Sequence, residues 1–316
     1  MTPRTTVAAI DCGTNSIKVL ICSVGDGASQ VLLRDSRVVR LGEGVDETGM
    51  LTDGALERTF AAIDEFAGII RSHGVPPGLT RFCATSATRD AGNAAVFTEG
   101  VRRRLGVEPE VLSGDEEAAL VFAGAISGLV SGVGPRVGPA PTEPVLVVDI
   151  GGGSTELVVG QGGPRESVSM DIGSVRLHER HLHTDPPTAD EVAACAADID
   201  RHIDEAGIGL DAVRSVIGTS GTIKTVACGV LDLGSYDREA FDGAELGNAA
   251  TRDFCDRLVA MTVQQRRALP YMHPGRADVI GAGALIWSRI LARVPVETHL
   301  VSEADILHGI AAAIAT

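Results

Sequence analysis

Residues 149–156 read Asp-Ile-Gly-Gly-Gly-Ser-Thr-Glu and follow the apolar run Val145–Val148. Residues 9–16 have the same order: Ala-Ile-Asp-Cys-Gly-Thr-Asn-Ser. In both stretches an apolar run leads to an aspartate, Asp11 or Asp149, and glycines and hydroxyl residues follow before another apolar run. One such stretch lies in each half of the chain. The repetition predicts a duplicated domain with one glycine-rich turn in each copy.

The composition fits two domains. The chain has 316 residues, of which 44% are hydrophobic and only 3% aromatic, so its cores must consist mainly of Val, Ile, Leu and Ala. A formal charge of −15 argues against broad electrostatic binding to nucleic acid or to acidic membranes. We find no apolar run of about 18 residues, so no membrane span is predicted, and no signal-peptide pattern. An acidic protein can still bind a small polyanion through local cations, backbone amides and a divalent metal.

The six cysteines stand at positions 12, 22, 83, 195, 228 and 255 and form no Cys-x-x-Cys pair. This pattern argues against a zinc site or a thioredoxin-type motif. Scattered single cysteines are typical of reduced, buried thiols, so we predict a cytoplasmic protein.

The order of the predicted elements is that of one α/β domain used twice. Each half begins with three short β-rich runs and then alternates helices with strands. In the first half, strands are predicted at 7–11, 17–23, 30–37, 80–85 and 110–112, and helices at 53–72, 93–105 and 113–129. In the second half, strands are predicted at 145–149, 155–160, 165–171, 213–217 and 299–301, and helices at 174–183, from 189, after 222, at 251–261, at 276–291 and from 303.

Three strands followed by alternating helices and strands is the order of a ribonuclease-H-like domain. Two such domains make the α/β architecture of the actin, hexokinase and Hsp70 superfamily, which has an interdomain cleft. We predict a first domain at 1–130, a Gly- and Pro-rich connection at 131–144 and a second domain at 145–302. The last helix, 303–316, is expected to return to the first domain.

A loop between two strands can bind phosphate through its backbone. Glycines let the chain turn tightly and bring amide N–H groups close to an anion. The candidates are Gly13, Thr14, Asn15, Ser16 and Lys18 in the first loop, and Gly151, Gly152, Gly153, Ser154 and Thr155 in the second. Neither loop is a Walker A or a Rossmann motif, because no helix follows directly. A single loop of this kind is more often an ordinary hairpin turn, and the matched pair favours a phosphate site.

A third glycine-rich turn lies between a predicted strand and a predicted helix. Its residues are Gly218, Thr219, Ser220 and Gly221. The N-terminus of a helix binds anions well, although a plain turn fits this stretch equally. Arg89 and Arg276 could each form bidentate contacts with phosphate, whereas most single arginines lie on the surface.

Two adjacent acids open the helix predicted at 113–129. Glu116 has capping-box spacing from Ser113 and is accounted for by that box. Glu117 points about 100° away around the helix and has no local partner, so it could reach into a cleft and take a proton from water. A solvated first-turn acid is the alternative. Asp11 and Asp149, at strand ends, could hold a metal directly or through water.

Three histidines lie close together in the sequence, at His178, His181 and His183. On a helix only the first two share a face, and no Cys or acid completes a ligand pattern. We interpret them as surface or packing residues rather than a metal cluster.

Five strings in this order resemble the exopolyphosphatase and guanosine pentaphosphate phosphohydrolase family (Ppx/GppA). They are Asp11-Cys-Gly-Thr-Asn-Ser-Ile-Lys, Ala84-Thr-Ser-Ala-Thr-Arg-Asp, Ser113-Gly-Asp-Glu-Glu-Ala, Asp149-Ile-Gly-Gly-Gly-Ser-Thr-Glu and Gly218-Thr-Ser-Gly-Thr. The resemblance covers nearly the whole chain, and the Ser113 string narrows it to this family.

The resemblance implies hydrolysis of terminal phosphoanhydride bonds in inorganic polyphosphate, or of the 5′-phosphate of guanosine pentaphosphate, with a divalent cation, usually Mg²⁺. It places the catalytic glutamate at Glu117, the metal-associated acids at Asp149 and Glu156, and the phosphate arginine at Arg89. It also leaves a homodimer open. Lys18 stands where many members have Arg. The chain ends at Thr316 without the HD-type helical region of longer members, which leaves its chain-length preference open.

The leading hypothesis is therefore metal-assisted hydrolysis of polyphosphate. The two loops would hold the terminal phosphates from opposite sides of the cleft, and Asp149 and Glu156, with Asp11 nearby, would hold Mg²⁺. Glu117 would deprotonate the attacking water, and domain closure would bring Arg276 to the substrate. An actin-fold kinase and a nucleotide-gated assembly protein are the alternatives from other functional classes.

Overall fold

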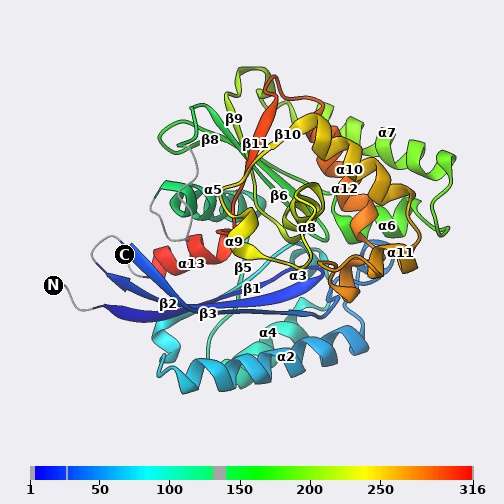
Figure 1. Cartoon of the computed structure of the whole chain (residues 1–316). Helices are drawn as coiled ribbons and strands as arrows, with labels where there is room; N and C mark the ends of the chain where they lie inside the picture. The colour runs from blue at the N-terminus through cyan, green and yellow to red at the C-terminus, as the bar shows by residue number, and fades with distance from the viewer. Residues whose placement is uncertain (1–3, 26–27, 131–139, 315–316) are drawn as a thin grey trace. The chain divides into compact units, whose positions relative to one another are not determined.

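The computed structural model describes residues 4–25, 28–130 and 140–314 (Figure 1). The chain divides into two compact units. Unit 1 contains residues 1–127 and 304–316, and unit 2 contains residues 128–303. Residues 131–139 of the predicted connection lie outside the described residues. Each unit is an α/β structure, so the predicted fold class is confirmed.

Unit 1 is built on a five-stranded sheet. Its strands are β1 (Thr5–Cys12), β2 (Ser16–Gly25), β3 (Ala28–Val38), β4 (Thr80–Ala84) and β5 (Glu110–Val111), in the order β3-β2-β1-β4-β5. Its helices are α1 (Val45–Thr48), α2 (Asp53–Ser72), α3 (Ser86–Asp90), α4 (Ala94–Leu105), α5 (Gly114–Val130) and α13 (Ile306–Ile314). Helices α2 and α4 cover one face of the sheet and α13 covers the other (Figure 1).

Unit 2 is built on a six-stranded sheet. Its strands are β6 (Val145–Ile150), β7 (Thr155–Gly160), β8 (Pro164–Met170), β9 (Ser215–Gly218), β10 (Glu245–Gly247) and β11 (Thr298–Val301), in the order β10-β11-β9-β6-β7-β8. Its helices are α6 (Ser174–His181), α7 (Ala189–Ala206), α8 (Gly221–Val230), α9 (Arg238–Phe241), α10 (Asn248–Ala260), α11 (Val263–Arg267) and α12 (Ile280–Leu291).

The two sheets share one topology. In each unit the first strand pairs antiparallel with the second and parallel with the fourth, as β1 does with β2 and β4 and as β6 does with β7 and β9. The third strand lies beyond the second in both sheets. Strand β10 is an addition at the edge of the second sheet. The duplication predicted from the repeated glycine-rich stretch is therefore confirmed at the level of strand order.

Capping side chains near the first turn determine where several of the helices begin. Helix α2 begins as predicted because the Thr52 hydroxyl accepts a hydrogen bond from Ala55 N at 3.2 Å. Helix α7 begins with a capping box between Thr188 and Glu191, and hydrogen bonds from the Thr184 hydroxyl and the Thr188 amide lower the pKa of Glu191 to about 2. The start predicted for α12 was wrong. Pro274–Arg276 forms a short 3₁₀ turn that His273 caps, so the α-helix begins only at Ile280.

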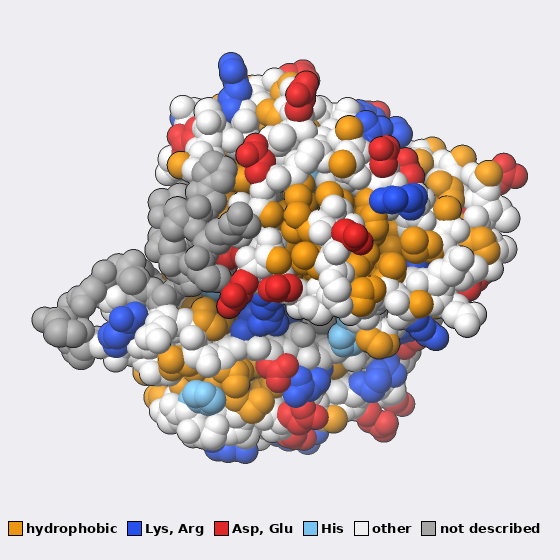
Figure 2. Space-filling model, in the orientation of Figure 1, with side chains coloured by type: hydrophobic (Ala, Val, Ile, Leu, Met, Phe, Trp, Pro, Cys, Tyr) orange, Lys and Arg blue, Asp and Glu red, His pale blue; other side chains and the backbone are white. Residues whose placement is uncertain are grey.

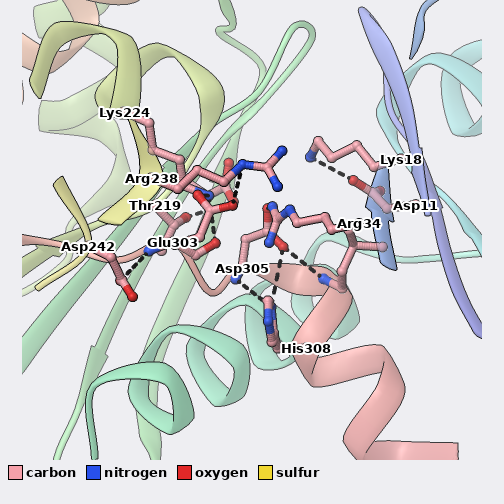
Figure 3. A network of polar contacts seen from close by, with 12 residues as sticks. Asp11, Lys18, Arg34, Thr219, Lys224, Arg238, Asp242, Glu303, Asp305 and His308 are labelled. Carbon is pink, nitrogen blue, oxygen red and sulfur yellow. Dashed lines mark hydrogen bonds and ion pairs between the residues drawn. The ribbon is translucent and has the colours of Figure 1, made fainter. Parts of the chain in front are cut away.

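The crossing from unit 2 back to unit 1 lies between Glu303 and Ala304. In unit 2, the Glu303 carboxylate pairs with Lys224 at 3.1 Å and with Arg238 at 3.4 Å. In unit 1, Asp305 pairs with Arg34 at 2.5 Å. Each end of the crossing is therefore held by ion pairs within its own unit (Figure 3).

All six cysteines are free and buried. Burial raises the pKa of the Cys83 thiol and of the Cys195 thiol to about 12. Both thiols are therefore protonated near neutral pH and are poor nucleophiles. This agrees with the prediction of buried thiols outside disulfides.

The surface is mixed in charge. On the face drawn in Figure 2, basic side chains are interspersed with acidic and apolar ones. Arg102 and Arg103 pair with Glu99 at 2.8 Å, which fits a solvated helix end.

Within the described ranges, no helix combines the length and the apolar character needed to cross a membrane.

Unit 2 contains a buried histidine that should make its stability depend on pH. His299 on β11 is 2% exposed, its Nδ1 lies 2.8 Å from Asn248 Oδ1, and its ring packs edge-on against Trp287. Burial lowers the pKa of His299 from 6.5 to about 4. The unfolded imidazole therefore binds a proton at a higher pH than the folded one.

We expect the free energy of unfolding of unit 2 to fall by about 3 kcal/mol as the pH is lowered from 6.5 to 4, because the unfolded state alone gains a proton in this range. Above pH 6.5 this contribution is constant. Urea titrations followed by the fluorescence of Trp287, the chain's single tryptophan, measure it. In His299→Gln the decline across this range should be smaller by that amount. An unchanged pH profile in the variant would contradict the assignment.

Candidate active site

The two glycine-rich stretches form equivalent hairpins. In the first, Gly13 N donates to Ser16 O at 3.0 Å, and in the second, Gly151 N donates to Ser154 O at 2.9 Å. We call them loop 1 (residues 12–16) and loop 2 (residues 150–155). The same strand register flanks both loops. Asp11 lies opposite Lys18 in one unit, and its counterpart Asp149 lies opposite Glu156 in the other.

Each loop has backbone donors that the protein itself does not use. Across the described residues, the N–H groups of Thr14 and Asn15 in loop 1 and of Gly152 and Gly153 in loop 2 have no hydrogen-bond acceptor. Buried or partly buried amides are usually paired in folded proteins. Consecutive unpaired N–H groups in a tight turn form a concave anion site. Each loop therefore has the donors expected of a phosphate-binding turn.

Loop 1 is held by side chains that the sequence alone did not indicate. The Thr14 hydroxyl lies 2.9 Å from the hydroxyl of Ser86, the first residue of α3. Gly42 N donates to Thr14 O at 2.9 Å, and a Cβ at position 42 would lie only 2.3 Å from Thr14 Cγ2. The loop is therefore fixed from two sides.

Lys18 does not stand free for phosphate in this structure. Its ammonium lies 2.9 Å from Asp11 Oδ2, the residue opposite it in the sheet (Figure 3). The pair is largely buried, with side-chain exposures of 20% for Lys18 and 6% for Asp11. At least one oxygen of Asp11 is thus occupied by a cation.

Glu117 and Arg89 lie together in unit 1. Glu117 is in the first turn of α5 and only 7% exposed, and its Oε2 lies 3.5 Å from Arg89 Nη1. The same Nη1 donates to Leu112 O at 3.1 Å. Glu117 was expected to have no local partner, and the partner that it does have, Arg89 of α3, is 28 residues away in the sequence. The Glu117 carboxylate is therefore both buried and next to a cation.

Glu116 has the structural role expected of it. Its carboxylate accepts hydrogen bonds from Ser113 N and from Ser113 Oγ, both at 2.8 Å. The backbone bond is the main reason that the pKa of Glu116 is lowered. The two adjacent acids are therefore distinguished: Glu116 closes the capping box and Glu117 is buried beside Arg89.

Loop 2 is packed against the start of α6. Ser174 N donates to Gly151 O, and Val175 N donates to Gly152 O, both at 2.9 Å. A Cβ on Gly173 would lie 2.4 Å from the Gly152 backbone, so only glycine allows this approach. These bonds use the carbonyls of Gly151 and Gly152 and do not involve the N–H groups of Gly152 and Gly153.

Two acids lie side by side next to loop 2. Asp149 is 8% exposed and Glu156 is 1% exposed, and they are direct cross-strand partners on β6 and β7. The Thr219 hydroxyl donates to Asp149 Oδ2 at 2.9 Å. The Ser169 hydroxyl donates to Glu156 Oε1 at 2.9 Å. Hydroxyls thus orient both carboxylates, and Ser169 is a residue that sequence reasoning missed.

The third turn joins β9 to α8 as predicted. The Ser220 side chain caps α8 by accepting from Ile223 N at 3.3 Å. The Arg276 guanidinium lies against Gly221, where a Cβ would be 2.6 Å from its Cζ. The backbone N of Arg276 donates to His273 O at 2.9 Å, in the turn that precedes α12. Its cation therefore lies at the N-terminus of α8 within unit 2.

The histidines between 178 and 183 form no metal cluster. His181 Nε2 lies 2.9 Å from Asp198 Oδ2, and α6 ends at His181, so His183 lies beyond the helix. Among the residues that the structure describes, no group of three or more His, Cys, Asp or Glu has the arrangement of a metal site. Any metal would rely on two protein carboxylates together with other oxygens.

The site residues thus fall into two sets, each within one unit. Unit 1 brings together loop 1, Lys18, Arg89 and Glu117. Unit 2 brings together loop 2, Asp149, Glu156, the third turn and Arg276. The sequence profile of the Ppx/GppA phosphatase family matches residues 20–315. The chain belongs to this family.

Similar proteins agree with the family assignment. Exopolyphosphatase 2 of Mycobacterium tuberculosis is 41% identical over 98% of this chain and 99% of its own length. A guanosine-5′-triphosphate,3′-diphosphate pyrophosphatase of Vibrio atlanticus is 33% identical over 69% of this chain and 42% of its own. The crystal structure of an exopolyphosphatase-like protein has a TM-score of 0.91, with 41% identity over 99% of this chain and 98% of that protein. The predicted Ppx/GppA family is therefore confirmed.

Proposed function

We propose that this chain is an exopolyphosphatase that hydrolyses the terminal phosphoanhydride bond of inorganic polyphosphate. The observation that carries this proposal is the pair of equivalent hairpins, each with two backbone N–H groups that have no acceptor in the protein. Polyphosphate offers a repeated anion to such donors. The relative with 41% identity over nearly the full length is named an exopolyphosphatase.

Glu117 is the general base in this proposal. This carboxylate is 7% exposed and lies 3.5 Å from Arg89. It can accept a proton from water and, once it has released that proton, pair with Arg89 again. The Arg89 guanidinium can also donate to a phosphoryl oxygen. The reaction is an in-line attack of water on the terminal phosphorus, with release of inorganic phosphate and of a chain one unit shorter.

The acids of unit 2 suit a hard divalent cation such as Mg²⁺. Mg²⁺ is usually held by one or two carboxylates, with water and substrate phosphates as its other ligands. Asp149 and Glu156 are adjacent, buried and already oriented by hydroxyls. A bound Mg²⁺ would supply positive charge to the phosphate oxygens. We assign the metal to these two acids rather than to Asp11, which pairs with Lys18.

A second candidate is hydrolysis of the 5′-phosphate of guanosine pentaphosphate. The relative from Vibrio atlanticus, whose name describes that activity, supports it over 69% of this chain.

The free, buried cysteines support a reducing, cytoplasmic location for this protein.

A phosphate-release assay with four substrates separates these functions. The purified chain is given long-chain polyphosphate, tripolyphosphate, guanosine pentaphosphate or ATP, each with Mg²⁺ and with EDTA. We expect the highest kcat/KM on polyphosphate and a loss of rate in EDTA. A higher kcat/KM on guanosine pentaphosphate would replace the proposal with the second candidate. Release from ATP alone would contradict both.

A further inference from the structure

Thr219 is the first residue after β9 and belongs to the third turn, which was predicted to bind phosphate. It is 0% exposed. Its hydroxyl donates to Asp149 Oδ2 at 2.9 Å, and its backbone N donates to Val148 O at 3.0 Å. A threonine has one hydroxyl hydrogen and one amide hydrogen to donate. Both donors of Thr219 are therefore used on neighbouring residues of β6, within unit 2.

A phosphate ligand would compete with Asp149 for the Thr219 hydroxyl. An ionised phosphate oxygen only accepts hydrogen bonds, so Thr219 could donate to it only by giving up the bond to Asp149. That bond joins a hydroxyl to a carboxylate that is 8% exposed. Hydrogen bonds to a charged group are stronger than neutral ones, and a buried carboxylate that loses its donor is costly. The geometry therefore favours Asp149 as the lasting partner of Thr219.

The bond from Thr219 also sets the orientation of the Asp149 carboxylate. The last torsion of an aspartate side chain has only a broad preference of its own. Thr219 is itself fixed by the neighbouring strands, since Gly218 O accepts from Ser302 N at 2.9 Å. Mg²⁺ requires nearly regular octahedral geometry, so the direction of each ligand oxygen affects its binding. Groups that orient metal ligands commonly determine metal affinity for this reason.

We propose that Thr219 is a positioning residue of the metal site, which holds Asp149 in the orientation that binds a divalent cation, and that it is not a phosphate ligand. The inference rests on the proposed function, in which Asp149 and Glu156 hold Mg²⁺. The hydroxyl of Ser169 has the same relation to Glu156, to which it donates at 2.9 Å. Each of the two acids thus has one hydroxyl that orients it.

The Thr219→Val variant keeps the shape of the side chain and removes the hydroxyl. Mn²⁺ alone, titrated into the full chain and followed by the electron paramagnetic resonance of the free ion, measures the metal site without substrate. We expect the Kd for Mn²⁺ to rise by about 10–100-fold, the usual effect of removing a group that orients a metal ligand. The Mg²⁺ concentration that gives half-maximal phosphate release should rise in the same direction.

Binding of tripolyphosphate in EDTA separates this role from phosphate binding. We expect its Kd, from calorimetric titration, to stay within about twofold of wild type in Thr219→Val, because the hydroxyl that is lost donates to Asp149. Thr219→Ser keeps the hydroxyl and should restore most of the Mn²⁺ affinity. Thr219→Ala removes the hydroxyl without placing a second methyl group beside the carboxylate, and it should behave like Thr219→Val.

Thr251→Val is the matched control. It makes the same change at another threonine of unit 2 that is 0% exposed, whose hydroxyl donates to Gly247 O at 2.9 Å. It should bind Mn²⁺ as wild type does. Wild-type Mn²⁺ affinity in Thr219→Val and Thr219→Ala would overturn the inference, and so would an equal loss in Thr251→Val or the absence of Mn²⁺ binding by wild type. A wild-type chain that binds Mn²⁺ but releases no phosphate from polyphosphate would instead overturn the proposed function.

Discussion

Replacing Glu117 with glutamine is expected to lower kcat on polyphosphate by about 10²–10⁴-fold, the usual contribution of a general base. The substitution keeps the size and shape of the side chain but removes its basicity. Glu117 is buried in the first turn of α5, so solvent cannot easily replace it as the base. Binding should persist, because the unpaired amides of loops 1 and 2 are unchanged.

Steady-state rates and equilibrium binding together test this assignment. Phosphate release gives kcat, and calorimetric titration with polyphosphate gives Kd, which should stay within a few-fold of wild type. Glu116→Gln is the matched control, since it makes the same change one residue earlier, in an acid that only closes the capping box with Ser113. The control should retain full turnover. Wild-type turnover in Glu117→Gln would remove Glu117 from the catalytic role.

The strand order and both loops could be predicted from the sequence because the apolar runs and the turn residues between them mark the same boundaries. Asp11 and Asp149 are each the last residue but one of a buried strand, and the glycines that follow favour a tight turn. Repetition of this pattern in each half indicated the duplication. The equivalent register of Asp11 with Lys18 and of Asp149 with Glu156 then follows from equal hairpin lengths.

Contacts between distant segments could not be predicted in this way. The bond between Thr14 and Ser86 joins two segments that are separated by the whole of α2. Arg40 carries no sign of its left-handed backbone, because that conformation comes from two hydrogen bonds to Asn15 rather than from its own preference. The partner of Glu117 depends on how α3 is placed beside α5. Such features depend on tertiary packing, which local periodicity does not encode.

Gly124→Ala is expected to destabilise unit 1 by about 3 kcal/mol or more, at the upper end of the cost of overpacking. In unit 1, α5 and the start of α13 approach so closely that a Cβ on Gly124 would lie 2.0 Å from Asp305 O. The contact is reciprocal, since a Cβ on Gly309 would lie 2.1 Å from Leu120 O. Both obstacles are backbone oxygens, which no rotamer change can move. Gly309→Ala should therefore have a similar effect.

Two probes and one control make this result specific. Far-UV circular dichroism follows both units, whereas the fluorescence of Trp287 follows unit 2. We expect the urea midpoint from dichroism to fall in Gly124→Ala, with a smaller change in the fluorescence midpoint. Gly68→Ala makes the same substitution on the exposed side of α2, where nothing lies within 4 Å of the added carbon. It should stabilise the chain by about 0.5–1 kcal/mol, because alanine favours helix. Equal midpoints for Gly124→Ala and wild type would mean that α5 and α13 can separate at little cost, and that their close approach is not needed for the stability of unit 1.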